Sequence, residues 1–104
     1  MPCLWTPLRS FVLAISAATA AASALASDAQ MRALAAPCAT CHGTQGHSLG
    51  GIPSIAGMER QQLLQKLMAY QQGTATATVM HQHAKAYTPL ELEALATFFS
   101  QQSH

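Results

Sequence analysis

The apolar positions of the chain recur mostly at helical spacing. Met31, Leu34 and Ala35 fall at i, i+3 and i+4, and they predict a first helix over residues 28–36. Proline lacks the backbone N–H that a helix interior uses, so Pro37 makes a regular continuation of this helix doubtful.

Two further apolar stripes predict two more helices. One is expected over residues 58–72, with Gly73 in a favoured C-terminal capping position. The last begins near Thr88, where Thr88, Pro89 and Glu91 combine an N-cap, a proline in the first turn and a capping-box acid. The apolar faces comprise Leu63, Leu64, Leu67 and Met68 in the earlier helix and Leu92, Leu95 and Phe99 in the last.

The stretches between these helices are rich in Gly, Thr and Pro. A loop is expected over residues 43–57, and an extended loop over residues 74–78. No run of alternating β-branched residues suggests a strand. The sequence therefore predicts a small all-α fold with three to four helices.

The N-terminus has the pattern of an export signal. Arg9 precedes an apolar run over residues 11–22, which is shorter than the roughly 20 residues of a membrane span. Small residues then suit signal peptidase, with cleavage expected after Ala26 or, alternatively, two residues earlier. We expect a signal peptide (1–26) and a periplasmic domain (27–104) that keeps no membrane anchor.

Charged residues are scarce. They make up 9% of the 104 residues, where about 25% is usual, and the formal net charge is +1. Neither a basic stripe for nucleic acid nor a polybasic membrane patch is present in the sequence. A freely diffusing carrier protein often uses a charged patch to steer its encounters, so the composition weakly favours a lasting, neutral interface.

The strongest chemical motif is Cys38-Ala39-Thr40-Cys41-His42. Each of its two thiols can add across one vinyl group of a haem, and the adjoining His42 then supplies an axial nitrogen to the iron. This is the attachment sequence of c-type haem. It predicts one haem c per chain, bound covalently by Cys38 and Cys41.

Other uses of the two cysteines fit the sequence less well. A structural zinc site needs four ligands, and the spacing of His81 and His83 is shorter than the usual three to five residues. A thiol–disulfide exchange motif would follow a strand, and none is predicted. A plain disulfide would leave His42 without a role.

The second axial ligand decides between electron transfer and ligand binding at the iron. Met80 is preferred, because the threonine-rich loop before it can cross the opposite haem face. Met58 is an alternative, and an imidazole from His81 or His83 is another, although both histidines are interpreted as solvent-facing. The methionines interpreted as core residues, from their places on the apolar stripes, are Met31 and Met68.

Pro53 has two interpretations. Its carbonyl could accept the Nδ1 proton of His42 and fix the ring, or the proline could simply shape the loop. Four other residues could contact haem propionates: Arg60, Lys66, Tyr70 and Tyr87. A solvated face is the preferred interpretation for the two cations, and half-buried helix positions would explain the two tyrosines equally well.

These segments together resemble class I cytochromes c over essentially the whole domain. The resemblance rests on the haem motif and its helix, residues 52–57, the Met80 region and the last helix. Residues 78–87 and 91–96 look like the small cytochrome subunits of flavocytochrome c sulfide dehydrogenases. The resemblance implies a helical fold around one covalent haem, with His42 and Met80 as axial ligands and the Pro53 carbonyl as the acceptor for the histidine.

The resemblance also implies a function. In such complexes a separate FAD-containing flavoprotein oxidises sulfide and passes electrons to the haem, which passes them to a downstream acceptor. The chain would then be a periplasmic electron-transfer subunit with no catalysis of its own. The open alternatives are a free c-type cytochrome shuttle and, less favoured, a ligand-binding haem sensor or enzyme.

Overall fold

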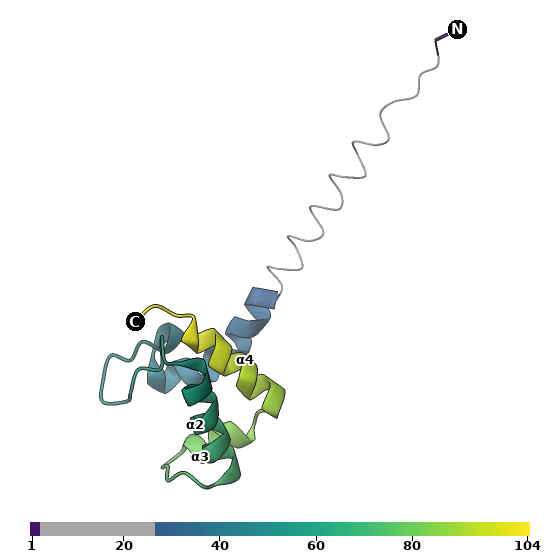
Figure 1. The fold of residues 1–104 in the computed structure, drawn as a ribbon. Coiled ribbons are helices and arrows are strands. Elements are labelled where there is room, and N and C mark those ends of the chain that lie inside the picture. Colours follow the sequence, from purple (N-terminus) through teal and green to yellow (C-terminus); the bar gives the residue numbers. More distant parts are fainter. Residues whose placement is uncertain (3–26) are drawn as a thin grey trace. The chain divides into compact units, whose positions relative to one another are not determined.

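The computed structural model describes residues 1–2 and 27–104. The expected signal peptide lies outside the described residues, apart from its first two. Residues Met31–His104 form one compact unit, and Met1–Gln30 belong to a second unit. The helices of the compact unit are labelled in Figure 1.

The regular structure of the described residues is helical, and it includes no strand. Residues 27–42 are helical. The elements that follow are the 3-10 turn η1 (Thr44–Gly46) and the helices α2 (Arg60–Gln72), α3 (Met80–Lys85) and α4 (Pro89–Ser100). The predicted all-α fold class is confirmed.

The predicted end of the first helix at residue 36 was wrong. The helix continues through Pro37 to residue 42, and the Gly43 N–H donates to the Ala39 carbonyl at 3.0 Å. Proline removes one helical hydrogen bond. On either side of it, however, Ala35 is buried in the apolar core and Cys38 packs against that core. This packing keeps the segment helical, so the cysteine motif lies on the last turns of a helix.

The helix α2 begins two residues later than predicted, because Glu59 caps it. The Glu59 carboxylate accepts hydrogen bonds from the N–H groups of Gln61 at 2.8 Å and Gln62 at 2.7 Å. These bonds satisfy two N–H groups that have no partner within the helix. The helix ends at Gly73, which adopts the left-handed conformation (φ 75°), as its predicted capping role requires.

The helix α3 was not predicted. It is only six residues long and has no apolar stripe, but it packs against α2. Ala84 is 1% exposed, and the Gln71 side-chain amide donates to the carbonyls of Ala84 at 3.3 Å and Tyr87 at 2.7 Å. Contacts distant in sequence therefore stabilise a turn of helix that local propensity does not favour.

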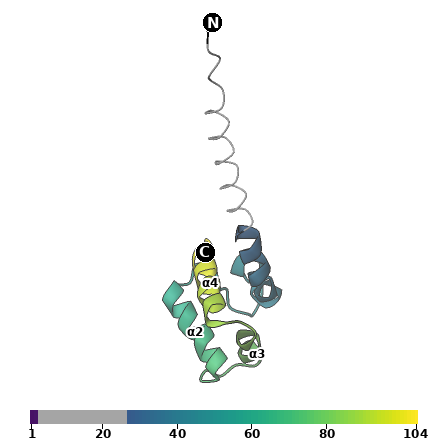
Figure 2. The ribbon, with the colours of Figure 1, turned by 90° about the vertical axis from the view of Figure 1, so that its right-hand side faces the viewer.

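The predicted start of α4 is confirmed. The Thr88 side chain accepts from the Glu91 N–H, the Glu91 carboxylate accepts from the Thr88 N–H at 2.7 Å, and Pro89 is the first helical residue. The core lies where α4 packs against α2 (Figure 2). Its buried members are Ala35, Leu63, Leu64, Leu92, Leu95, Ala96 and Phe99.

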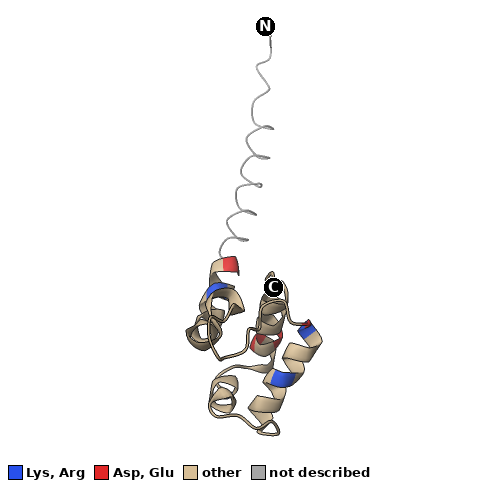
Figure 3. Ribbon diagram, turned by 90° about the vertical axis from the view of Figure 1, so that its left-hand side faces the viewer, with Lys and Arg blue, Asp and Glu red and all other residues tan. Residues whose placement is uncertain are grey.

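Charged side chains are few over the described residues, and both signs occur (Figure 3). None of the helices in the described ranges combines the length and the hydropathy needed to cross a bilayer.

Candidate functional site

A cavity of about 380 Å³ opens beside the core, bounded by the end of the first helix, the loop before α2, and the helices α2, α3 and α4. Its walls are mainly apolar. The apolar side chains of the lining include Pro37, Ile52, Ile55, Leu63, Leu67, Val79, Leu95 and Phe99. Such a cavity suits a large, mostly hydrophobic ligand held by a few polar groups.

The five site residues selected from the sequence all line this cavity: Cys38, Cys41, His42, Pro53 and Met80. They come from three segments of the chain, and Met80 is separated from the cysteine motif by α2. The fold thus brings these three segments together at one cavity. In the sequence, only the chemistry of their side chains suggested that they belong to one site.

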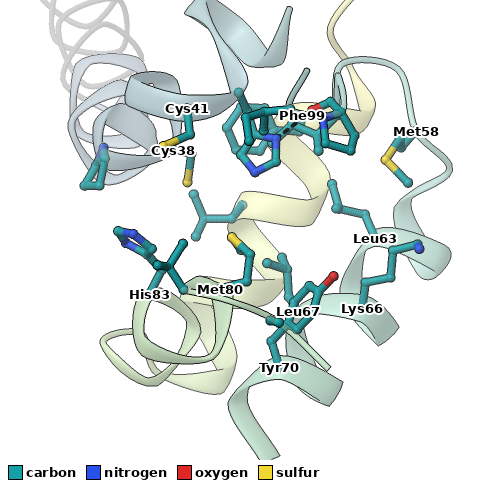
Figure 4. Close-up of a pocket in the computed structure, with 18 of the residues that line it drawn as sticks. Cys38, Cys41, Met58, Leu63, Lys66, Leu67, Tyr70, Met80, His83 and Phe99 are labelled. Carbon is teal, nitrogen blue, oxygen red and sulfur yellow. Dashed lines mark hydrogen bonds between the residues drawn. The ribbon is translucent and has the colours of Figure 1, made fainter. Parts of the chain in front are cut away.

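Cys38 and Cys41 occupy the last turns of the first helix, and both are free thiols (Figure 4). Their spacing of three residues places them on neighbouring positions of one helix face. Cys38 is half-buried and Cys41 is exposed. Burial raises the pKa of the Cys38 thiol, and a hydrogen bond with Tyr87 partly opposes this rise.

His42 Nδ1 lies 2.7 Å from the carbonyl oxygen of Pro53. A carbonyl can only accept, so Nδ1 carries the proton in this hydrogen bond, and Nε2 is the ring nitrogen left to face a metal. The loop that carries Pro53 is itself fixed, since the Ile55 N–H donates to the Gly46 carbonyl at 2.9 Å. Gly46 has φ 85°, and a Cβ there would come within 2.9 Å of Ile55 and of the Ala56 nitrogen, so this position favours glycine.

Met80 begins α3, and its thioether extends into the cavity (Figure 4). Met58, the alternative ligand, also lines the cavity, at its opposite side from α3. Met31 and Met68 are absent from the lining and pack against the core, in keeping with their interpretation as core residues.

The two histidines after Met80 differ. His83 is exposed but lines the cavity, one turn after Met80, whereas His81 is half-buried and is not part of the lining. The interpretation of both as simply solvent-facing was therefore incomplete. Because residues three apart share a helix face, the spacing of Met80 and His83 would have indicated this position, had α3 been predicted.

The residues present fit a haem. An apolar cavity is lined by two free thiols, an imidazole with one nitrogen engaged, and a thioether, and this set of groups can hold a c-type haem. The zinc interpretation gains no support, because the described residues contain no group of three or more His, Cys, Asp or Glu side chains placed to hold a metal.

Three curated relatives were found. The chain is 42% identical over 66 residues to the cytochrome subunit of sulfide dehydrogenase from Chlorobaculum tepidum, covering 64% of this chain and 60% of that protein. It is 33% identical over 63 residues to cytochrome c-552 of Acidithiobacillus ferridurans, covering 61% of this chain and 27% of the relative. It is 35% identical over 68 residues to the thiosulfate dehydrogenase electron acceptor of Thiomonas intermedia, covering 64% of this chain and 31% of the relative.

No family model matches the chain. The chain spans less than two thirds of the length of each of these relatives. Two of the three are named as cytochromes, which implies a haem cofactor. Together with the helical fold, these similarities support a class I cytochrome c that resembles the cytochrome subunit of sulfide dehydrogenase.

Proposed function

We propose that this chain is a periplasmic, monohaem electron-transfer subunit, with its haem bound covalently through Cys38 and Cys41. His42 and Met80 would hold its iron. The single observation that carries the proposal is that Met80 and the cysteine–histidine motif line one apolar cavity, although 38 residues separate His42 from Met80.

Each side chain has a definite task in this site. The two thiols attach the cofactor, and the Pro53 carbonyl holds the His42 ring in one orientation. A haem c supplies reversible one-electron chemistry when bound. Two protein ligands that stay in place in both oxidation states keep the rearrangement between those states small, and the apolar walls limit the access of water.

The proposed partner is an FAD-containing sulfide dehydrogenase flavoprotein, from which electrons pass through this chain to a downstream acceptor. One relative is named as a subunit of sulfide dehydrogenase and another as the electron acceptor of thiosulfate dehydrogenase. Leu49 and Ile52 are exposed in the loop beside the cavity, at 102% and 46%. An apolar loop on a sparsely charged unit suits a lasting interface better than brief encounters steered by charge.

Haem attachment is tested by producing the full chain with a bacterial c-type cytochrome maturation system. Mass spectrometry should find a polypeptide that lacks residues 1–26 and carries one haem, and its spectrum should be that of a low-spin, six-coordinate iron. The matched variants are Cys38→Ser and Cys41→Ser, each of which should lose one thioether bond. A matured chain with no added haem mass would overturn the proposal.

The partner is tested separately, by isolating the haem protein from its native periplasm. Co-purification of an FAD protein, with haem reduction that depends on sulfide, supports the subunit assignment. A monomeric haem protein that such a flavoprotein does not reduce favours the free shuttle instead. Strong carbon monoxide binding to the reduced protein would favour a ligand sensor.

A further inference from the structure

Lys66 is the one Lys, Arg, Asp or Glu residue among the described residues that line the cavity. It lies on α2 and is exposed, and no carboxylate of the described residues pairs with it. Arg60, at the start of the same helix, is not part of the lining. Among the residues that the structure describes, the cavity lining therefore includes one lysine, without a carboxylate partner, at its edge.

The position of Lys66 relative to the two thiols is the informative feature. Figure 4 shows Cys38 and Cys41 at one end of the cavity and Lys66 at the other. A haem has the same polarity, because its two vinyl groups and its two propionates lie on opposite edges of the porphyrin. A haem whose vinyl edge is attached to the thiols would direct its propionate edge toward α2.

We propose that Lys66 forms the ion pair with a haem propionate and thereby raises the reduction potential of this site. The inference rests on the proposed covalent haem. It replaces the interpretation of Lys66 as a purely solvated cation and excludes Arg60 from the same role. Tyr70, one turn after Lys66 on α2, also lines the cavity and completes a polar corner there.

The effect on the potential follows from charge. The oxidised site carries one more positive charge than the reduced site, so a nearby ammonium group destabilises the oxidised form. The pair is at the edge of the cavity, where water and salt screen it, so the interaction is weaker than in a buried site. An apolar stem that lies along the cavity wall keeps the ammonium in place.

The test compares matured holoproteins by redox titration and by resonance Raman spectroscopy of the propionate bending bands. Lys66→Gln should lower the midpoint potential and shift these bands, and Lys66→Arg should restore both toward the parent values. Arg60→Gln is the matched control, since it removes a cation from the same helix outside the cavity, and it should change the potential less. Lys66→Met keeps the apolar stem and gives the same readout if Lys66→Gln matures poorly.

Equal potentials and unshifted bands in Lys66→Gln and Arg60→Gln would overturn the inference. Haem content is measured first on every variant, which separates a failure of the proposed function from a failure of the ion pair alone. A parent chain without haem removes the proposed function and this ion pair together. A parent with haem, whose propionate bands do not respond to Lys66, removes only the ion pair.

Discussion

The His42 imidazole and the Pro53 carbonyl are joined by a hydrogen bond of 2.7 Å across eleven residues of sequence. This bond fixes which ring nitrogen carries the proton, and therefore which nitrogen can bind a metal. It also connects the end of the first helix to the loop that precedes α2. One contact thus sets both the chemistry of the imidazole and the position of a cavity wall.

Pro53→Ala tests whether the carbonyl or the ring of the proline matters. The acceptor is a backbone group, so we expect the hydrogen bond and the spectrum of the holoprotein to persist. The free energy of unfolding should fall by about 0.4–1 kcal/mol, because the unfolded chain gains conformational freedom. Denaturant titration measures the loss, and proton NMR follows the Nδ1 proton. Pro89→Ala serves as the control, and disappearance of the Nδ1 signal in Pro53→Ala alone would contradict the expectation.

Met80→Ala should leave the haem attached but open one coordination position. We expect a lower midpoint potential and new carbon monoxide binding in the reduced state, because thioether ligation favours the reduced iron. Spectra before and after carbon monoxide addition measure the change. Met58→Ala, which also removes a thioether from the cavity wall, should keep the parent spectrum. The assignment of Met80 fails if the two variants exchange these phenotypes.

The double variant Met80→Ala/His83→Ala completes this series. His83 lines the same cavity and is the imidazole best placed to replace a missing methionine. A low-spin spectrum in Met80→Ala that becomes high-spin in the double variant would identify His83 as the substituting ligand. Identical high-spin spectra in both would show that no substitution occurs.

Leu92→Ala should destabilise the protein strongly. Leu92 is 0% exposed at the contact of α4 with α2, so its truncation leaves a cavity and costs about 2–5 kcal/mol. Leu90→Ala, two residues earlier and 77% exposed, should change the free energy of unfolding by less than about 0.5 kcal/mol. Thermal unfolding of both holoproteins measures the difference, and similar losses would argue against the packing described.

Thr88→Ala should lower the free energy of unfolding by about 1 kcal/mol, because it removes the side-chain acceptor of the α4 capping box. Thr76→Ala, in the exposed loop before α3, provides a threonine control without a helix to cap. Chemical denaturation compares the two variants. An equal effect at both positions would mean that the cap contributes nothing measurable.

The stability should fall on acidification through two helix caps. Hydrogen bonds from backbone N–H groups lower the pKa of Glu59 and of Glu91 below the ordinary value. The unfolded chain therefore binds more protons below about pH 4.3, and stability present above this value is lost as the pH falls through the lowered pKa values. Glu59→Gln and Glu91→Gln should each flatten the pH dependence of unfolding. Variants whose unfolding keeps the pH dependence of the parent would contradict this expectation.

Local chemistry explains what could be predicted from the sequence. The capping box of α4, the glycine at the end of α2 and the apolar stripes all depend on residues within four positions of one another. The cysteine–histidine motif is also local, which is why its five residues were sufficient to predict a haem. The choice of Met80 rested on the kind of ligand required and on the loop before it.

Contacts between distant segments decided the rest. The first helix continues through Pro37 because Ala35 is buried in the core and Cys38 packs against it. The helix α3 forms because it packs against α2, whose Gln71 side chain donates a hydrogen bond to the Tyr87 carbonyl just after α3. The Tyr87 hydroxyl donates to the Leu34 carbonyl at 3.1 Å, across 53 residues of sequence. These partners lie too far apart in the sequence for a local pattern to relate them.

The sequence by itself therefore determined the helical fold class and predicted the chemistry of the cysteine–histidine motif, since both depend on short stretches. Only the tertiary structure decided which side chains share the cavity. It placed His83 and Lys66 in the lining and left His81 and Arg60 out of it. The physical reason is that membership of a cavity depends on how helices pack, which is a property of the whole chain.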